Sequence, residues 1–345
     1  MALLEVSHLA KHYEKSRGTL GALSRKPRGF VRAVDDISFS IEKGEMLALV
    51  GESGCGKTTT AETVLRVLEP TDGTIKLNGT DITTLSQHEL RPLRRKMQIV
   101  YQDPYESLDP RYRVARTIEE PLIIHGVGAS KSERRELVSQ ALAQVELSPP
   151  NLFLDRFPHE LSGGQRQRVA IAAALVVNPE LLIADEPVSM LDVSVRAGIM
   201  ALLSRICRER GMGILLITHD LGVAAHFTDR VAVMYLGRIV ETGSTLAVLG
   251  GPQHPYTKAL CDVVPRRQMT RVPVNLLRGE ADTAGGPAAG QGCRFRPRCQ
   301  YAIDRCAQED PGLRPVAENG HVAENGHEAA CVRSGLFELI QINGN

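Results

Sequence analysis

Apolar residues occur in two patterns along the first half of the chain. Leu3–Leu9 and Ala33–Ile41 alternate apolar and polar residues, which predicts strands with one buried face. Met46–Val50, Leu181–Ala184 and Ile214–Thr218 are short apolar runs, which predict buried strands. The segment Thr74–Leu77, followed by Asn78-Gly79, predicts a further strand that ends in a tight turn.

Helical spacing of apolar residues separates these strands. Thr58–Leu68 predicts a helix, and Pro104–Glu160 is mostly helical in pattern, with a capping box at Ser130–Glu133. One helix face there contains Leu137, Val138, Ala141, Leu142 and Val145, and a later one contains Val195, Ile199, Leu202, Leu203 and Ile206. Alternating strands and helices predict an α/β fold with a largely parallel sheet, into which a helical subdomain is inserted.

Two regions lack this regularity. The stretch 14–32 is basic and rich in glycine, and we interpret it as a loop that is either simply solvated or in contact with lipid headgroups or a partner. The regular pattern fades near Gly243. Beyond it, Val316–His321 is repeated at once as Val322–His327, which predicts a tolerated surface insertion.

Composition excludes several classes of protein. The 345 residues are 43% hydrophobic, and 41 Lys and Arg are balanced by 40 Asp and Glu, so no global field favours nucleic acid. The longest apolar run, Val169–Val177, is too short to span a bilayer, and Met1–Glu5 does not begin a signal peptide. We therefore expect a cytosolic protein whose seven cysteines are reduced or bound to metal.

A complete phosphate-binding loop follows the third predicted strand. Gly51-Glu-Ser-Gly-Cys-Gly-Lys57-Thr58 lies between a strand and a helix, which is the context that this motif requires. Its glycines let backbone amides approach the β-phosphate of ATP, Lys57 reaches the β- and γ-phosphates, and the Thr58 hydroxyl binds Mg²⁺. The candidate nucleotide-binding residues here are Gly51, Ser53, Gly54, Cys55, Gly56, Lys57, Thr58 and Thr59.

Two carboxylates end the apolar strand Leu181–Ala184. Asp185 is placed to hold Mg²⁺, and the adjacent Glu186 can orient and deprotonate an attacking water. Four apolar residues before the pair and Pro187 after it favour this reading over a solvated turn.

The segment Leu161-Ser-Gly-Gly-Gln165, together with the loop and the carboxylates, resembles the ATP-binding cassette (ABC) ATPases. The resemblance implies an antiparallel β subdomain beside the parallel core. It also implies that Glu186 is the general base and that His219 contacts the γ-phosphate. Further roles that it implies are Gln102 near Mg²⁺ and the water, Asp192 at the dimer interface, and Tyr13 against adenine.

In that family Leu161–Gln165 acts on the nucleotide of an opposing chain. Ser162, Gly163, Gly164 and Gln165 stand at the start of a helix expected over Gln165–Val177, whose N-terminus favours phosphate. The complete site then needs two cassettes, and the resemblance favours a paralogous second ATPase over a second copy of this chain.

Three other segments resemble the ATP-binding subunits of dipeptide and oligopeptide permeases, a group that includes nickel importers. They are Gln102–Pro110, Arg156–Glu160 and Gln253–Ala259. This resemblance implies a peripheral ATPase on the cytosolic face of the inner membrane, two permease subunits, and an extracytoplasmic binding protein as an indirect partner. A nickel or other small-solute importer, and a soluble ABC protein acting on ribosomes or DNA, remain alternatives.

The tail beyond the cassette contains four cysteines, Cys293, Cys299, Cys306 and Cys331. Their spacing leaves three interpretations open: a 4Fe-4S cluster, a zinc site or free thiols. Cys207 and Cys261 are expected to be packing residues instead. The expected division is a nucleotide-binding domain over 1–245, with its helical subdomain at about 104–165, and an extension over 246–345.

Overall fold

A computed structural model describes residues 2–14, 30–103, 107–263, 292–318, 321–322 and 326–334. The chain divides into two compact units, and each is described by itself. The first contains Met1–Glu5, Ser40–Met46 and Lys76–Ile217, and the second contains Val6–Phe39, Leu47–Ile75 and Thr218–Asn345. Most of the predicted basic loop, residues 15–29, and the Ala- and Gly-rich stretch before Gly292 lie outside the described residues.

A buried parallel sheet forms the centre of the first unit. β6 (Met97–Val100) pairs with β7 (Leu181–Asp185), and β7 pairs with β8 (Gly213–Thr218). Val100 lies opposite Ala184, and Asp185 lies opposite Ile217, so the three strands end at one edge. All residues of β7 and β8 are buried, which explains why both were visible in sequence as apolar runs.

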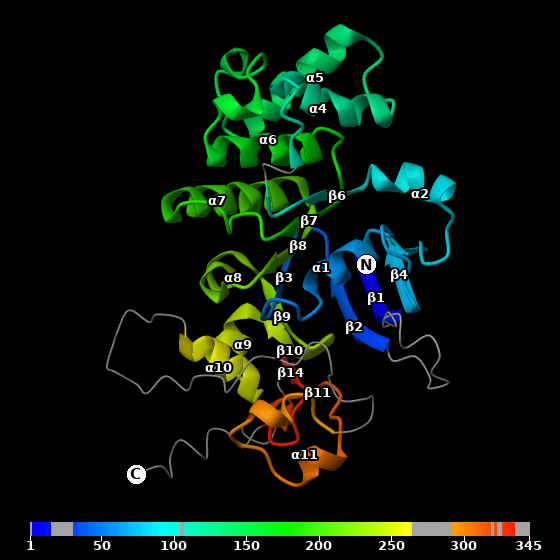
Figure 1. Cartoon of the computed structure of the whole chain (residues 1–345), viewed down its shortest axis with the longest axis vertical. Coiled ribbons are helices and arrows are strands. Elements are labelled where there is room, and N and C mark those ends of the chain that lie inside the picture. The colour runs from blue at the N-terminus through cyan, green and yellow to red at the C-terminus, as the bar shows by residue number, and fades with distance from the viewer. Residues whose placement is uncertain are drawn as a thin grey trace, which may run out of the picture. The chain divides into compact units, whose positions relative to one another are not determined.

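Three helices of the first unit pack together as the predicted helical subdomain, α4 (Val114–Ile124), α5 (Lys131–Gln144) and α6 (Gly163–Leu175), as Figure 1 shows. The short helices η2 (Pro150–Leu152) and η3 (Pro158–Glu160) connect α5 to α6, whereas α2 (Gln87–Arg94) precedes β6 and α7 (Val193–Arg210) follows β7.

Only half of the predicted capping box forms at α5. The Ser130 hydroxyl accepts from the Glu133 amide at 3.1 Å, but the Glu133 carboxylate accepts from Ala129 rather than from Ser130. Helix α5 still begins where the sequence predicts, because one cap is sufficient.

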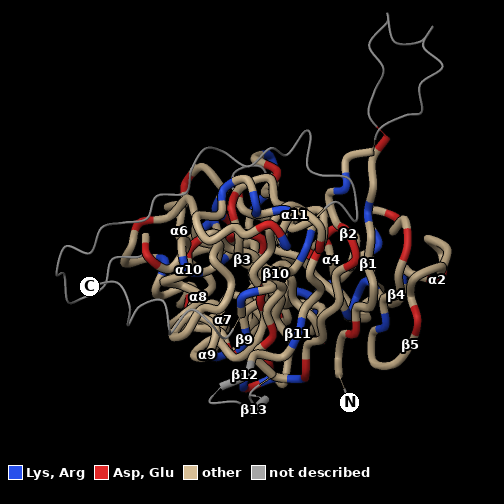
Figure 2. The backbone as a smooth tube through the Cα atoms, turned by 90° about the horizontal axis from the view of Figure 1, so that it is seen from below, with Lys and Arg blue, Asp and Glu red and all other residues tan. Residues whose placement is uncertain are grey.

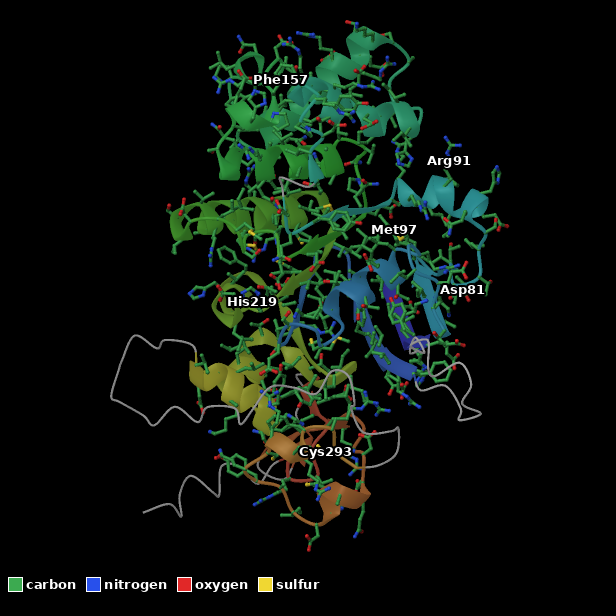
Figure 3. All side chains as sticks on the ribbon, viewed as in Figure 1. Asp81, Arg91, Met97, Phe157, His219 and Cys293 are labelled. Atoms are coloured by element: carbon green, nitrogen blue, oxygen red, sulfur yellow. The ribbon has the colours of Figure 1, made fainter. Side chains whose placement is uncertain are left out.

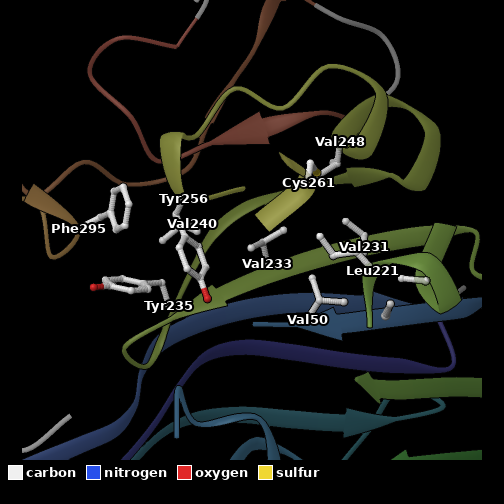
Figure 4. Packing of buried hydrophobic residues seen from close by; sticks show 12 residues of the cluster. Val50, Leu221, Val231, Val233, Tyr235, Val240, Val248, Tyr256, Cys261 and Phe295 are labelled. Atoms are coloured by element: carbon white, nitrogen blue, oxygen red, sulfur yellow. The ribbon is translucent and has the colours of Figure 1, made fainter. Parts of the chain in front are cut away.

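In the second unit, β3 (Met46–Val50) pairs in parallel with β9 (Arg230–Tyr235). β10 (Arg238–Ser244) is antiparallel to β9, and β14 (Glu328–Ala329) lies between β10 and β11 (Arg314–Pro315). The helices of this unit before residue 264 are α1 (Lys57–Val64), α8 (Leu221–Phe227), α9 (Thr245–Gly250) and α10 (Pro255–Val263). Figure 4 shows the core that β3 and β9 share with Tyr256 of α10 and Phe295 of the tail.

Four more strands follow one another in the order β2 (Phe30–Ile41), β1 (Leu4–Glu14), β4 (Asp72–Leu77) and β5 (Thr80–Asp81). The predicted strands are therefore present, although β1 and β2 are longer than expected. Asn78 and Gly79 both have positive φ, 49° and 75°, and connect β4 to its antiparallel partner β5. The tight turn predicted at Asn78-Gly79 is confirmed.

The tail is more regular than the sequence predicted. Beyond Gly243 come α9, α10, η4 (Arg296–Arg298) and α11 (Arg305–Gln308), and β12 (Ala317–Glu318) pairs with β13 (His321–Val322). The prediction of a surface insertion is wrong at both ends of the duplication. Val316 and His327 are each 1% exposed, and His327 Nε2 lies 2.7 Å from Oε1 of buried Glu241.

Cys207 and Cys261 are both buried, as expected of packing residues.

Acidic and basic residues are mixed along the described backbone, as Figure 2 shows. Within the described residues, no helix has the length and apolar character needed to cross a membrane.

Candidate nucleotide site

The loop from Gly51 to Gly56 connects strand β3 directly to helix α1. Gly56 is the N-cap residue, with φ of 111°, and among the described residues no side chain caps this helix. The first amides of α1 are therefore left for another acceptor. An N-terminus of this kind, preceded by a glycine-rich loop, binds phosphate through its amides and its dipole.

Two glycines of the loop are required by close backbone contacts. A Cβ at Gly56 would lie 2.0 Å from the Ala33 carbonyl oxygen, and a Cβ at Gly51 would lie 2.2 Å from that of Met234. Neither contact can relax through side-chain movement, because both partners are backbone atoms. The backbone of the neighbouring strands β2 and β9 thus fixes the shape of this glycine-rich loop.

Lys57 is buried, and its ammonium group turns back onto the loop. Nζ donates to the carbonyl oxygens of Gly51 at 2.8 Å and Glu52 at 2.9 Å. Ser53 and Thr58, by contrast, are exposed. Lys57 Nζ therefore faces the loop, and its two carbonyl partners are ones that it can exchange for phosphate oxygens.

The side chain of Cys55 points into the protein and is 4% exposed. Burial raises the pKa of its thiol, although the nearby Lys57 opposes this rise. Its carbonyl oxygen accepts from the Gly237 amide at 2.8 Å, and Thr59 is half-buried at the first turn of α1. The buried side chain of Cys55 is therefore turned away from a ligand on the exposed side of the loop.

In the first unit, the predicted acidic residues lie at the carboxyl edge of the parallel sheet. Asp185 ends β7 and is 5% exposed, and Glu186 is half-buried. Glu186 has φ of 46°, a left-handed conformation rare for this residue type, and its amide donates to the Ile217 carbonyl at 2.9 Å. Gln102 is exposed two residues beyond β6, and the β6–β7 register brings it to the same edge.

Ser162 and Gln165 form a reciprocal capping box at the start of α6. The Ser162 hydroxyl accepts from the Gln165 amide at 3.3 Å, and the Gln165 side-chain oxygen accepts from the Ser162 amide at 3.0 Å. The helix begins at Gly163, two residues before the expected start. A Cβ at Gly164 would lie 2.6 Å from Val195 Cγ1, so this glycine permits the close approach of α6 and α7.

Asp192 is the N-cap residue of α7, and the segment before it is held by a residue that the sequence did not single out. Arg196 donates from Nε to the Leu191 carbonyl at 2.7 Å and from Nη2 to the Ser189 carbonyl at 3.2 Å. Its position one turn after Asp192 was the available signal, since helical residues four apart share a face.

His219, labelled in Figure 3, is exposed immediately after β8 and belongs to the second unit. The Asp220 amide donates to Thr218 Oγ1 at 3.0 Å, and the Asp220 carboxylate caps α8 through the Gly222 amide at 2.8 Å. These two hydrogen bonds fix the turn that contains His219. Tyr13 lies on β1 and is 39% exposed, with Lys11 Nζ 5.2 Å from its ring centroid.

The four tail cysteines line one apolar pocket with His254 and Phe295. All four are free thiols, and burial raises the pKa of Cys293 to about 11 and that of Cys331 to about 12. Within the described part of the chain, no group of three or more His, Cys, Asp or Glu residues is arranged to hold a metal ion. This finding supports neither the 4Fe-4S nor the zinc interpretation of the four cysteines.

Comparison with known proteins gives matches to both parts of the chain. Residues 34–189 match the ABC transporter family, and residues 240–306 match the oligopeptide/dipeptide transporter C-terminal region. A putative peptide import ATP-binding protein of Brucella ovis is 44% identical over 97% of this chain and 98% of its own length. The oligopeptide transport ATP-binding protein AppF of Bacillus subtilis is 42% identical, over 93% and 96% respectively.

The fold also matches solved structures. One is a dimeric ATP-binding cassette in a post-hydrolysis state, bound to ADP and phosphate. It is 31% identical, has a TM-score of 0.61, and the match covers 70% of this chain and 98% of that one.

Proposed function

Because the chain belongs to the ABC transporter family of ATP-binding subunits, we propose that it hydrolyses ATP to drive the import of peptides. The observation that carries the proposal is the uncapped N-terminus of α1 behind a glycine loop that neighbouring backbone holds in place. The peptide cargo is supported by the oligopeptide/dipeptide C-terminal region and by relatives named for peptide import.

In this proposal the phosphate-binding loop and the predicted acidic residues contribute different groups to ATP binding. The amides from Ser53 to Thr58 bind phosphate, Lys57 exchanges its carbonyl partners for β- and γ-phosphate oxygens, and Thr58 and Asp185 hold Mg²⁺. Mg²⁺ supplies charge neutralisation at the phosphates when it is bound.

Glu186 accepts a proton from the attacking water, which Gln102 helps to orient beside Mg²⁺. His219 contacts the γ-phosphate, and Tyr13 stacks on adenine. The left-handed backbone conformation of Glu186 supports its role as the proton acceptor, since non-glycine residues with strained backbone conformations concentrate at functional sites.

The site is complete only when two cassettes meet. Ser162 to Gln165 of one chain then contact the γ-phosphate bound by the other, and Asp192 lies at their interface. The position of Ser162 to Gln165 at the N-terminus of α6 supports this arrangement, because the positive end of the helix dipole favours an anion. The related cassette in its post-hydrolysis state is also dimeric. We propose a paralogous ATPase as the second cassette.

The partners follow from the same proposal. Residues 1–245 form the nucleotide-binding domain, with its helical subdomain at about 104–165, and 246–345 form the extension. The region of Gln102 contacts two permease subunits at the cytosolic face of the inner membrane, to which this chain binds peripherally. An extracytoplasmic binding protein delivers the cargo, and this chain does not touch it.

The cargo can be tested in proteoliposomes that contain this chain, its two permeases and the second ATPase. Binding protein loaded with a di- or oligopeptide should stimulate ATP hydrolysis, and Lys57→Ala should abolish that stimulation. Stimulation by nickel-loaded binding protein, with none by peptides, would assign the chain to a nickel importer. Stimulation by ribosomes or DNA would place it among the soluble ABC proteins.

We also propose that the four tail cysteines bind a 4Fe-4S cluster. Such a cluster is larger than a single metal ion and is held by four thiolates. The sulfurs of the four cysteines line one apolar pocket and can bind the cluster after losing their protons. Arg296 and Arg333 line the same pocket and would offset its negative charge. Anaerobically purified protein should contain iron and sulfide and lose both in Cys331→Ser. Zinc without iron, or neither metal, would refute the cluster.

A further inference from the structure

Glu52, the second residue of the phosphate-binding loop, is held by two side chains that lie far along the sequence. Arg298 donates from Nη1 to Glu52 Oε2 at 2.8 Å and from Nη2 to Oε1 at 2.9 Å. The Glu52 amide donates to the Tyr256 hydroxyl at 2.9 Å. Since the Glu52 carbonyl accepts from Lys57 Nζ, this one residue connects the tail with the lysine of the ATP site.

Tyr256 is held rigidly in this position. It is fully buried and packs against Tyr235 and Phe295, with ring centroids 4.7 and 5.5 Å away (Figure 4). Burial raises the pKa of its hydroxyl far above neutrality, so the oxygen stays uncharged beside the loop. An uncharged oxygen can accept from the Glu52 amide without placing a negative charge next to phosphate.

The segment Gln253–Tyr256 is fixed by buried hydrogen bonds. The Glu241 carboxylate accepts from the amides of Gln253 at 2.7 Å and His254 at 2.9 Å, and it also pairs with His327. His254 Nδ1 accepts from the Tyr256 amide at 3.1 Å. Burial lowers the pKa of His254 to about 3, which leaves the ring neutral and this acceptor available at physiological pH.

Arg298 is equally constrained. Its side chain is 8% exposed, and its guanidinium lies 5.8 Å from the centroid of the Tyr235 ring. It ends η4, immediately before Cys299. Two parallel, charge-assisted hydrogen bonds to one carboxylate are the strongest form of such a pair, and removing one partner leaves the other charge uncompensated.

We propose that Arg298 and Tyr256 are positioning residues for ATP, through which the C-terminal extension completes the phosphate-binding loop. Arg298 neutralises a carboxylate that would otherwise repel the triphosphate, and Tyr256 fixes the backbone of the same residue. The inference rests on the proposed ATPase function and assigns the extension a part in nucleotide affinity. His254 and Phe295, which contact Tyr256, also line the cysteine pocket.

The test is the ATP affinity of the full-length chain, measured by calorimetry, with KM and kcat measured in the reconstituted complex. Arg298→Gln should raise the Kd and KM for ATP on the order of tenfold, the effect of one uncompensated charge near phosphate, with little change in kcat. Arg305→Gln is the matched control, because Arg305 is an exposed tail arginine paired with Glu309. It should leave the Kd unchanged.

A double variant separates positioning from mere folding. Glu52→Gln combined with Arg298→Gln should restore most of the affinity, since the carboxylate that needs Arg298 is gone, whereas a folding defect would not be rescued. Tyr256→Phe should weaken ATP binding with the melting temperature nearly preserved. An unchanged Kd in Arg298→Gln, or no rescue in the double variant, would overturn the inference. Failure of the wild-type chain to bind ATP would instead refute the proposed function.

Discussion

A side chain larger than hydrogen has no room at Gly56. Its φ of 111° is unfavourable for other residues, and a Cβ would meet the Ala33 carbonyl oxygen at 2.0 Å. The motif in the sequence identified this glycine, but only the packing of β2 against the loop shows why a methyl group is excluded. Glu52 is different, because its partner Arg298 is 246 positions away and no local pattern indicates the pair.

Gly56→Ala should therefore abolish ATP binding and reduce the free energy of unfolding by roughly 3 kcal/mol. Gly79→Ala is the control, since Gly79 also has positive φ but a Cβ there meets nothing within 4 Å. That substitution should cost only about 1 kcal/mol and leave ATP binding intact. Urea unfolding and calorimetry measure both effects, and equal losses in the two variants would contradict the packing argument.

Asp35 is a buried carboxylate whose stability effect depends on pH. Burial alone would raise its pKa, but hydrogen bonds and charge from Arg294, with a further bond from His12, lower it below the ordinary value. A lowered folded-state pKa means that the carboxylate stabilises the protein above its unfolded pKa of about 4, and this contribution is lost as pH falls through the folded value.

Asp35→Asn should thus lower the free energy of unfolding by about 3 kcal/mol at neutral pH, because Arg294 is left buried without its charge partner. The difference from the wild-type chain should shrink as the pH falls below about 4. Asp36→Asn, at a carboxylate that pairs with His8 on the surface, should change stability by less than about 1 kcal/mol. A difference for Asp35→Asn that does not vary with pH would exclude this explanation.

At the scale of elements, the sequence predicted the strands and helices that a local pattern of apolar and polar residues specifies. β3, β7 and β8 were recognised because buried parallel strands are continuously apolar, and α6 was found within two residues of its start. The regular structure after Gly243 was missed because α9 has only six residues and α10 nine, which is too short for a clear period. The burial of Val316 and His327 depends on β10 and β14 meeting, which no local segment encodes.

Arg196 connects α7 to the loop that precedes it, through the carbonyls of Ser189 and Leu191. If that loop aligns the two cassettes, Arg196→Ala should lower kcat about tenfold, since small misplacements of catalytic groups are costly. Stability should fall by only about 1 kcal/mol. Arg208→Ala, at an exposed position of the same helix, is the control for steady-state hydrolysis. An unchanged kcat in Arg196→Ala would remove this role.

At the scale of the whole molecule, neither the fold nor the cassette motifs identify the cargo. The phosphate-binding loop and the Asp185–Glu186 pair predict ATP hydrolysis, and the motif Leu161–Gln165 predicts a second cassette, but many ABC proteins share these features. What points to peptides is the C-terminal region over residues 240–306 and its likeness to peptide import subunits. The contacts of Arg298 and Tyr256 with Glu52 connect this C-terminal region to the phosphate-binding loop.

The central claim is that Glu186 activates water at an ATP clamped between two cassettes, and Glu186→Gln tests it most directly. The first measurement is single-turnover ATP hydrolysis by the reconstituted complex. The second is the molecular mass of the ATP-bound cassettes, which shows whether they have paired. We predict that hydrolysis falls about a thousandfold while ATP binding is retained and the closed pair accumulates, because only the proton acceptor is lost. Hydrolysis near the wild-type rate, or binding without any cassette pairing, would contradict the account.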